Sequence, residues 1–248
     1  MGTPAIANAN PIARLIASTI GLKTIMALTG FVWIGFVLGH MVGNLQIFLP
    51  GYGPADPELG AHAINKYAAM LKATGGALWV ARLVLLGAFV THVWAAITLA
   101  RRNKAARPVD YERHSKIQAK ASSYYMLISG LMLLAFIIFH LAHFTLGLVQ
   151  PGAYAINHLD HGLPDVYKMF ILGFRNPIFA GGYIISNVLL GLHLHHATSS
   201  MFQTLGLRTP KYRRIVDKAG VAIAASATIG NVMMPLAVVL GLIGQSVV

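Results

Sequence analysis

The stretch ISGLMLLAFIIFHLAHFTLGLV, residues 128–149, contains no charged side chain. A helix that spans a bilayer needs roughly 20 mostly apolar residues, so this stretch alone is long enough to cross a membrane. It nevertheless contains two histidines, His140 and His143. An ionisable side chain inside a membrane helix is costly and usually functional. This segment therefore indicates both a membrane fold and a functional role for its histidines.

The rest of the chain has the same apolar character. Of its 248 residues, 56% are hydrophobic and only 10% are charged, whereas an ordinary soluble domain carries about 25% charged residues. Five runs are long and apolar enough to span a bilayer, at residues 22–48, 76–100, 122–149, 177–202 and 219–244. We therefore expect an all-α membrane protein with a single domain over residues 1–248. Its five transmembrane helices should form an antiparallel bundle.

The basic residues predict the orientation of this bundle. The formal net charge is +12, and most of the 19 Lys and Arg residues lie in alternate connecting segments. Short loops rich in Lys and Arg stay cytoplasmic, which places the N-terminus inside and the C-terminus outside. A basic inner face suits anionic lipid or an acidic soluble partner. The inner basic residues are Arg14, Lys23, Arg101, Arg102, Lys104, Arg107, Arg113, Lys116, Lys120, Arg208, Lys211, Arg213, Arg214 and Lys218.

The connecting segments and the absence of cysteine narrow the chemistry further. Without cysteine the chain has no disulfide, no thiolate metal site, no iron–sulfur ligand and no c-type haem attachment. Residues 49–75 form an outer connection with a short amphipathic stretch at 62–71. Residues 150–176, rich in Gly, Pro and Asp, form a second outer loop. The run at 219–244 has no histidine and is expected to be a packing helix whose small residues allow close approach.

Histidines lie inside four of the five apolar runs. One such histidine is commonly a neutral side chain that hydrogen-bonds across helices, but four helices with the same feature favour a shared ligand role. A zinc site would need three or four ligands at one height. A proton relay would include a carboxylate, and none of the seven acidic residues falls within a predicted run. The histidines in question are His40, His92, His140, His143, His193, His195 and His196.

The depth of these histidines predicts two pairs at two heights. His40 and His140 each lie 18 residues after the start of an outward run, and His92 lies 16 residues after the start of an inward run, as does His193. At 1.5 Å per residue, each lies about 24–27 Å along its helix, so the two levels are separated by roughly 15–20 Å. Two facing pairs of imidazoles can ligate two haem irons, one above the other.

Neighbouring histidines compete for these positions. On an α-helix His143 lies about 300° from His140, on the same side and one turn away. His195 lies about 200° from His193 and faces elsewhere, whereas His196 returns to the side of His193. Depth alone therefore leaves open the choice between His140 and His143, and between His193 and His196.

Four motifs in order along the chain resemble a known family. They are ALTGFVWIGFVLGHMVGNLQIF, THVWAAITLARRNKAARPVDY, SGLMLLAFIIFHLAHF and GLHLHHATSSMFQTLG. Together they are similar to the single-chain di-haem cytochrome b subunit of succinate dehydrogenase and fumarate reductase, the cytochrome b558 type. The resemblance covers essentially the whole chain with the same number of helices. It implies the membrane anchor and quinone-reacting subunit of succinate:quinone oxidoreductase, respiratory complex II, in a prokaryotic cytoplasmic membrane.

The resemblance also implies which residues bind the cofactors. In that family the first histidine of the third-run pair and the first of the fourth-run cluster are ligands, which are His140 and His193 here. His40 and His140 would then hold the iron of a distal haem b, and His92 and His193 that of a proximal haem b. The family further implies a flavoprotein subunit with FAD and an iron–sulfur subunit on the cytoplasmic face, with menaquinone or ubiquinone as the membrane substrate. The dicarboxylate site would lie on a partner subunit.

Further residues are candidates for haem propionates or quinone. Arg82 lies ten residues before His92, toward the outer face, where it can pair with a distal propionate or extend to the lipid headgroups. On the inner side the candidates are Lys23, Arg113, His114, Lys120 and His196. Some relatives place a glutamate in a helix near the distal quinone. The nearest carboxylates here belong to Asp56 and Glu58 in the outer loop.

Two other functions are compatible with parts of the pattern. One is the di-haem cytochrome b anchor of another respiratory enzyme, such as a hydrogenase or a formate dehydrogenase; the order of the four motifs disfavours it. The other is a haem-free transporter, which predicts paired Gly or Pro interruptions at mid-depth. Only the run at 219–244, with Asn231 and Pro235, hints at such an interruption.

Overall fold

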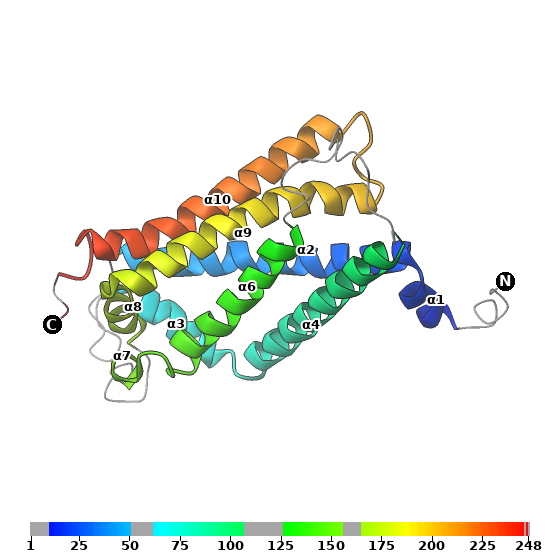
Figure 1. The fold of residues 1–248 in the computed structure, drawn as a ribbon. Coiled ribbons are helices and arrows are strands. Elements are labelled where there is room, and N and C mark those ends of the chain that lie inside the picture. Colours follow the sequence, from blue (N-terminus) through cyan, green and yellow to red (C-terminus); the bar gives the residue numbers. More distant parts are fainter. Residues whose placement is uncertain (1–9, 51–61, 107–125, 156–164, 246, 248) are drawn as a thin grey trace, which may run out of the picture.

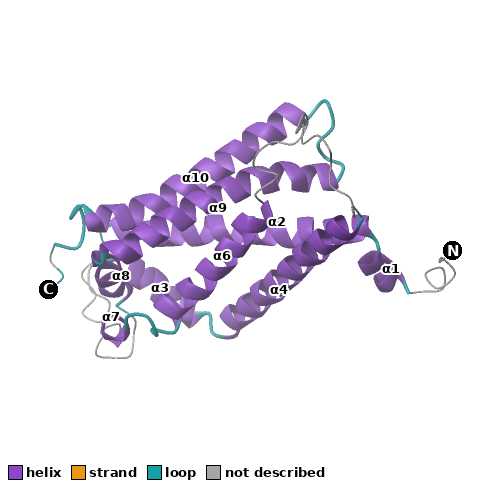
Figure 2. Ribbon diagram, in the orientation of Figure 1, coloured by secondary structure: helices purple, strands orange, loops and turns teal. Residues whose placement is uncertain are grey.

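The computed structural model describes residues 10–50, 62–106, 126–155, 165–245 and 247. The described residues form helices and no strand, as Figure 2 shows. The helices are α1 (Pro11–Ala17), α2 (Thr19–Asn44) with the 3₁₀-helix η1 (Leu45–Phe48), α3 (Ala63–Ala73), α4 (Gly76–Ala105), α6 (Met126–His140) with the π-helix η2 (Leu141–Thr145), α7 (Pro151–Ala155), α8 (Val166–Arg175), α9 (Pro177–Thr204) and α10 (Arg213–Val239).

Five of these helices are long and apolar enough to cross a membrane. They are α2 with η1, α4, α6 with η2, α9 and α10, and each falls on one of the five predicted runs. The five lie alongside one another in Figure 1. For the described residues, the prediction of helices with five segments long and apolar enough to span a membrane is therefore confirmed.

Local sequence signals explain where several of these helices begin. Ser18 precedes α2 and accepts a hydrogen bond from the Gly21 amide at 2.8 Å. Asn176 does the same for α9 through the Ile178 amide at 2.9 Å, and Pro177 occupies the first helical position. Both are favoured N-terminal residues because they satisfy amides that have no partner within the helix.

The prediction for the fifth span was wrong at both ends. It began at residue 219 and ended at 244, whereas α10 begins at Arg213 and ends at Val239. The first two turns continue the helix with charged side chains, which can reach the headgroup layer, and Gly241 terminates it with a φ of 69°. Asp217 consequently lies within this span, contrary to the expectation that no carboxylate does. It is paired with Arg208 at 2.9 Å and accepts a hydrogen bond from Ser199 at 2.9 Å.

The second outer loop also differs from the prediction, because residues 150–176 contain helices. Asp165 caps α8 by accepting a hydrogen bond from the Lys168 amide at 3.0 Å. One face of α8 is deeply buried, with Ile171 and Phe174 only 1% and 2% exposed. The Gly, Pro and Asp content of the whole loop concealed this short amphipathic stretch.

The helices pack unevenly. α9 and α10 lie against each other along much of their length, and a cluster that includes Leu194, Met201 and Ala227 joins them to α2. A Cβ added at Gly191 would overlap the Thr228 hydroxyl at 1.9 Å, so this crossing requires glycine. In contrast, α4 packs mainly on α2 and α6 mainly on α9, while α4 and α6 share few contacts.

Polar contacts connect helices at both ends of the molecule. At one end, Arg102 in the last turns of α4 donates hydrogen bonds to the carbonyls of Ala17 at 2.9 Å and Ile16 at 3.3 Å. The end of α4 therefore lies beside the start of α2. At the other end, Asn65 of α3 is 2% exposed and bonds the start of α8. It donates to Asp165 at 3.1 Å and accepts from the Tyr167 amide at 2.9 Å.

We expect Asn65→Ala to lower the free energy of unfolding by about 1–3 kcal/mol, because it leaves a buried amide without its acceptor. The thermal unfolding midpoint of the purified protein in detergent, followed by circular dichroism, would measure this change. Lys72→Ala, at an exposed position on the same helix, should leave the midpoint within error. Equal midpoints for both variants would contradict the role assigned to Asn65.

Candidate histidine-pair site

His40 of α2 and His140 of α6 face each other directly. Their ring centroids are 5.9 Å apart, and the ring planes are nearly perpendicular at 87°. Phe36 stacks on His40 at 5.3 Å, and Phe136 lies 6.0 Å from His140. The structure therefore brings together two histidines that are 100 residues apart in the sequence, within aromatic surroundings.

The second pair consists of His92 of α4 and His193 of α9, which are close enough to interact electrostatically. The Nδ1 atom of His92 lies 3.1 Å from the hydroxyl of Thr29 on α2. Likewise, Nδ1 of His193 lies 3.3 Å from the hydroxyl of Ser129 on α6. Each ring of this pair is thus held by a hydroxyl from a neighbouring helix.

The hydroxyls determine which nitrogen of each ring carries the proton. Thr29 donates its own proton to the Ile25 carbonyl at 2.8 Å, and Ser129 donates to the Met126 carbonyl at 3.1 Å. In this arrangement each oxygen accepts from the imidazole, which corresponds to the tautomer with the proton on Nδ1. Nε2 consequently keeps its lone pair, which is the arrangement that a metal-binding histidine has when its other nitrogen is held by a hydrogen bond.

A chain of hydrogen bonds extends from His140. The Tyr183 hydroxyl of α9 lies 3.3 Å from Nδ1 of His140 and 3.1 Å from Nδ1 of His143. Nε2 of His143 lies 2.7 Å from the Oε1 atom of Gln150. Because Oε1 only accepts, His143 donates from Nε2, Tyr183 donates to His143, and His140 donates to Tyr183.

This chain distinguishes the two histidines of α6. Both ring nitrogens of His143 already have partners, and the side chain is 3% exposed. His140 takes part in this chain only through Nδ1, so its Nε2 atom lies outside the chain. The helix widens after His140 into the π-helix η2, whose Leu146 amide bonds the Leu141 carbonyl at 2.9 Å. Single π-turns of this kind are frequent at functional sites.

His40 has a different partner. Its Nε2 atom lies 3.0 Å from the side-chain nitrogen of Asn44, one turn further along α2. The Asn44 amide donates to Nε2, and a ligand at this nitrogen would take its place. Since this contact is exposed and within one helix, rotation of the Asn44 side chain is sufficient to release it.

The two pairs share a sequence pattern. Thr29 and Gly30 precede His40 by eleven and ten residues, and Ser129 and Gly130 precede His140 by the same intervals. In space, an added Cβ at Gly30 would lie 3.5 Å from the His92 ring, and one at Gly130 would lie 3.7 Å from the His193 ring. On α2 and α6 alike, the hydroxyl and the glycine contact one histidine of the His92–His193 pair. The histidine that follows on the same helix belongs to the His40–His140 pair. The glycine spacing is visible in the sequence, but the role of the hydroxyls is not.

Trp33 provides a hydrogen-bond donor near the histidine pairs. The indole Nε1 of Trp33 is buried and has no hydrogen-bond partner among the described residues. Trp33 lies on α2 between the levels of Gly30 and His40 and contacts Phe36 and Phe89. His92, His140 and His193 are half-buried and His40 is exposed, so all four rings retain accessible surface. Across the described residues, no three His, Asp or Glu side chains are arranged so that they could hold one metal ion.

Among the other candidate residues, His196 is close enough to His193 to interact with it electrostatically. The Arg82 guanidinium lies over the Trp79 ring at 4.8 Å, both on exposed positions of α4. Lys23 is exposed near the start of α2, and His196 is half-buried on α9. His114, Arg113 and Lys120, and the outer-loop residues Asp56 and Glu58, lie outside the described residues.

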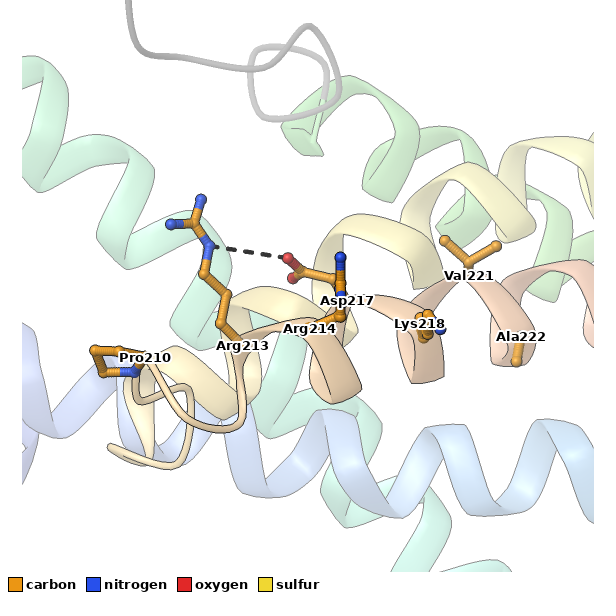
Figure 3. Close-up of a pocket in the computed structure, with 7 residues that line it drawn as sticks. All are labelled: Pro210, Arg213, Arg214, Asp217, Lys218, Val221 and Ala222. Carbon is orange, nitrogen blue, oxygen red and sulfur yellow. Dashed lines mark ion pairs between the residues drawn. The ribbon is translucent and has the colours of Figure 1, made fainter.

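A basic cavity of about 650 Å³ lies at the start of α10, away from the histidines. Figure 3 shows it with Arg213 directed at Asp217, an ion pair of 4.0 Å. Apolar side chains continue the lining along the helix. The lining consists of Pro210, Arg213, Arg214, Asp217, Lys218, Val221 and Ala222.

Comparison of the chain with models of protein families, with curated proteins and with solved structures finds no significant match.

Proposed function

We propose that this chain is a di-haem cytochrome b, the membrane anchor and quinone-reacting subunit of a succinate:quinone oxidoreductase. The observation that carries the proposal is the arrangement of His92 and His193, each of which has a hydroxyl of a neighbouring helix at Nδ1. A hydrogen bond at one ring nitrogen is how a metal-binding histidine is commonly oriented, and Nε2 would be the ligand atom. The four family-like motifs around these histidines support the same conclusion.

The proximity of His40 and His140 supports a ligand shared by this outer pair, because their ring centroids are 5.9 Å apart although they come from different helices. His40 and His140 would hold the outer haem, and His92 and His193 the inner one. A haem at each pair would supply a one-electron carrier.

The surrounding residues orient the ligands and exclude water. Thr29 and Ser129 hold the inner rings, and Tyr183 holds His140. Aromatic side chains around the outer pair, including Phe136 and Phe144, limit water there. The buried indole N–H of Trp33 is a donor for a polar group, a propionate or a quinone carbonyl, placed between the helices.

The orientation follows from the basic residues. The N-terminus lies in the cytoplasm and the C-terminus outside, with the five spans in an antiparallel bundle. The beginning of α10 and its basic cavity then face the cytoplasm. This face would receive the iron–sulfur subunit and, through it, the flavoprotein with FAD. The site for the dicarboxylate belongs to that partner, and this chain contributes the path to the quinone in a prokaryotic cytoplasmic membrane.

We expect two non-covalent b haems per chain, because there are two histidine pairs and no cysteine. A pyridine haemochrome assay on the purified protein, with protein quantified by amino-acid analysis, measures the ratio. Acid-acetone extraction should remove all of the haem. One haem per chain, or haem that resists extraction, would contradict the assignment. Two haems in a complex that contains no FAD would instead favour the anchor of a hydrogenase or formate dehydrogenase.

A further inference from the structure

The Tyr183 hydroxyl joins two histidines with different roles. It accepts a hydrogen bond from Nδ1–H of His140 and donates its own proton to Nδ1 of His143. His143 extends the chain, because its Nε2–H donates to the Oε1 atom of Gln150 at 2.7 Å. Successive donors that point along one chain polarise one another. The oxygen of a phenol that donates its proton is a stronger acceptor than the oxygen of an isolated one.

The inner pair has no comparable chain. The Thr29 and Ser129 hydroxyls that accept from His92 and His193 donate to carbonyls of their own helices. Among the described residues they lead to no further side chain. The hydrogen-bond chain behind His140 therefore extends through more side chains than the contact behind either histidine of the inner pair.

Packing keeps Tyr183 in this position. The side chain is 5% exposed, and Phe174 and Phe136 contact its ring edge-to-face with centroids 4.8 Å and 5.1 Å away. A fixed, water-poor setting preserves the direction of the hydrogen bonds, because water would compete for each donor. The hydroxyl is thus positioned for His140 independently of solvent.

We propose that Tyr183 is a positioning residue that makes His140 a stronger electron-donating ligand and so lowers the reduction potential of the outer haem. The inference deepens the proposed function and rests on it. A hydrogen bond from Nδ1–H raises the basicity of the coordinating nitrogen, which stabilises the oxidised iron. The chain through His143 to Gln150 strengthens this effect, and α6 and α9 together set the outer potential.

The test is a potentiometric titration of both haems in the purified complex. Tyr183→Phe retains the ring and removes the hydroxyl, so the outer haem should shift to a higher potential while the inner haem stays unchanged. Gln150→Leu removes the acceptor of His143 at the far end of the chain and should shift the outer potential in the same direction by less. The low-spin EPR signal of the outer haem should change with each potential shift.

Two matched variants serve as controls. Tyr154→Phe removes a hydroxyl that donates to the Thr145 carbonyl in the same region and should leave both potentials unchanged. Ser129→Ala should raise the inner potential alone.

An unchanged outer potential in Tyr183→Phe, or equal shifts at both haems, would overturn the proposal. If Tyr183→Phe loses the outer haem, the Gln150→Leu titration decides by the same criterion. A wild-type protein without haem would overturn the proposed function and this inference with it.

Discussion

His193→Ala is expected to lower the haem content from two per chain to one, whereas His195→Ala is expected to leave both. His193 is the histidine of the fourth-span cluster whose Nδ1 is held by Ser129 and which interacts with His92. His195 points about 200° away around the same helix. Reduced-minus-oxidised optical spectra and EPR of the purified variants, with haem quantified per chain, measure the difference.

The His193→Ala and His195→Ala variants control each other for folding, because both remove an imidazole from the same two turns of α9. A shared loss of haem would indicate a damaged helix. Loss of haem in His195→Ala with retention in His193→Ala would show that the helical register is wrong. The same comparison applies to α6, where His140→Ala should lose the outer haem and His143→Ala should keep it with a shifted potential.

The second large effect concerns turnover. His140→Ala, in a complex that still assembles, is expected to reduce succinate-to-quinone turnover to a small fraction of that of the unmodified complex. The two histidine pairs lie at different depths, which simple bracing of the bundle would not require. If quinone reacts at the outer end, electrons cross part of the membrane potential, and a full crossing is worth about 2.3 kcal/mol per 100 mV. Turnover in sealed vesicles should then respond to an imposed potential.

Succinate oxidation with a soluble dye acceptor is the control, because that acceptor takes electrons before they enter this chain. It should be equal in the variant and the unmodified complex. Near-normal quinone turnover with the outer haem gone would exclude the transmembrane route. The inner pair, beside the iron–sulfur partner, would then be the working site.

The spans were predictable from the sequence because apolar length is a property of contiguous residues. All five runs fall on helices, and Pro177 marked the start of α9 correctly. The end of the fifth span was predicted incorrectly, because hydropathy does not detect where a helix stops inside an apolar run. Gly241 provides that stop through its backbone conformation. Helix α8 was missed because its amphipathic pattern is short and lies among turn-forming residues.

The site was predictable in its ligand candidates but not in their partners. Depth along each helix brought His40 level with His140, and the structure places the edge of one of these rings against the face of the other. Depth alone left His140 and His143 unresolved, and only the family resemblance favoured His140, because their difference depends on Tyr183 and Gln150 outside α6. The hydroxyls of Thr29 and Ser129 resemble ordinary small residues of membrane helices. Only the distance to a histidine 63 or 64 residues away reveals their role.

The uneven packing of the spans has a consequence for biogenesis. Each histidine pair combines one residue of α2 or α9, His40 or His193, with one residue of α4 or α6, His92 or His140. α4 and α6 share few contacts, since α4 packs on α2 and α6 packs on α9. If the proposed haems enter from the bilayer, separation of α4 from α6 would give access to both pairs while the packing of α9 on α10 and on α2 is kept. Haem insertion would then follow the membrane integration of an already folded polypeptide.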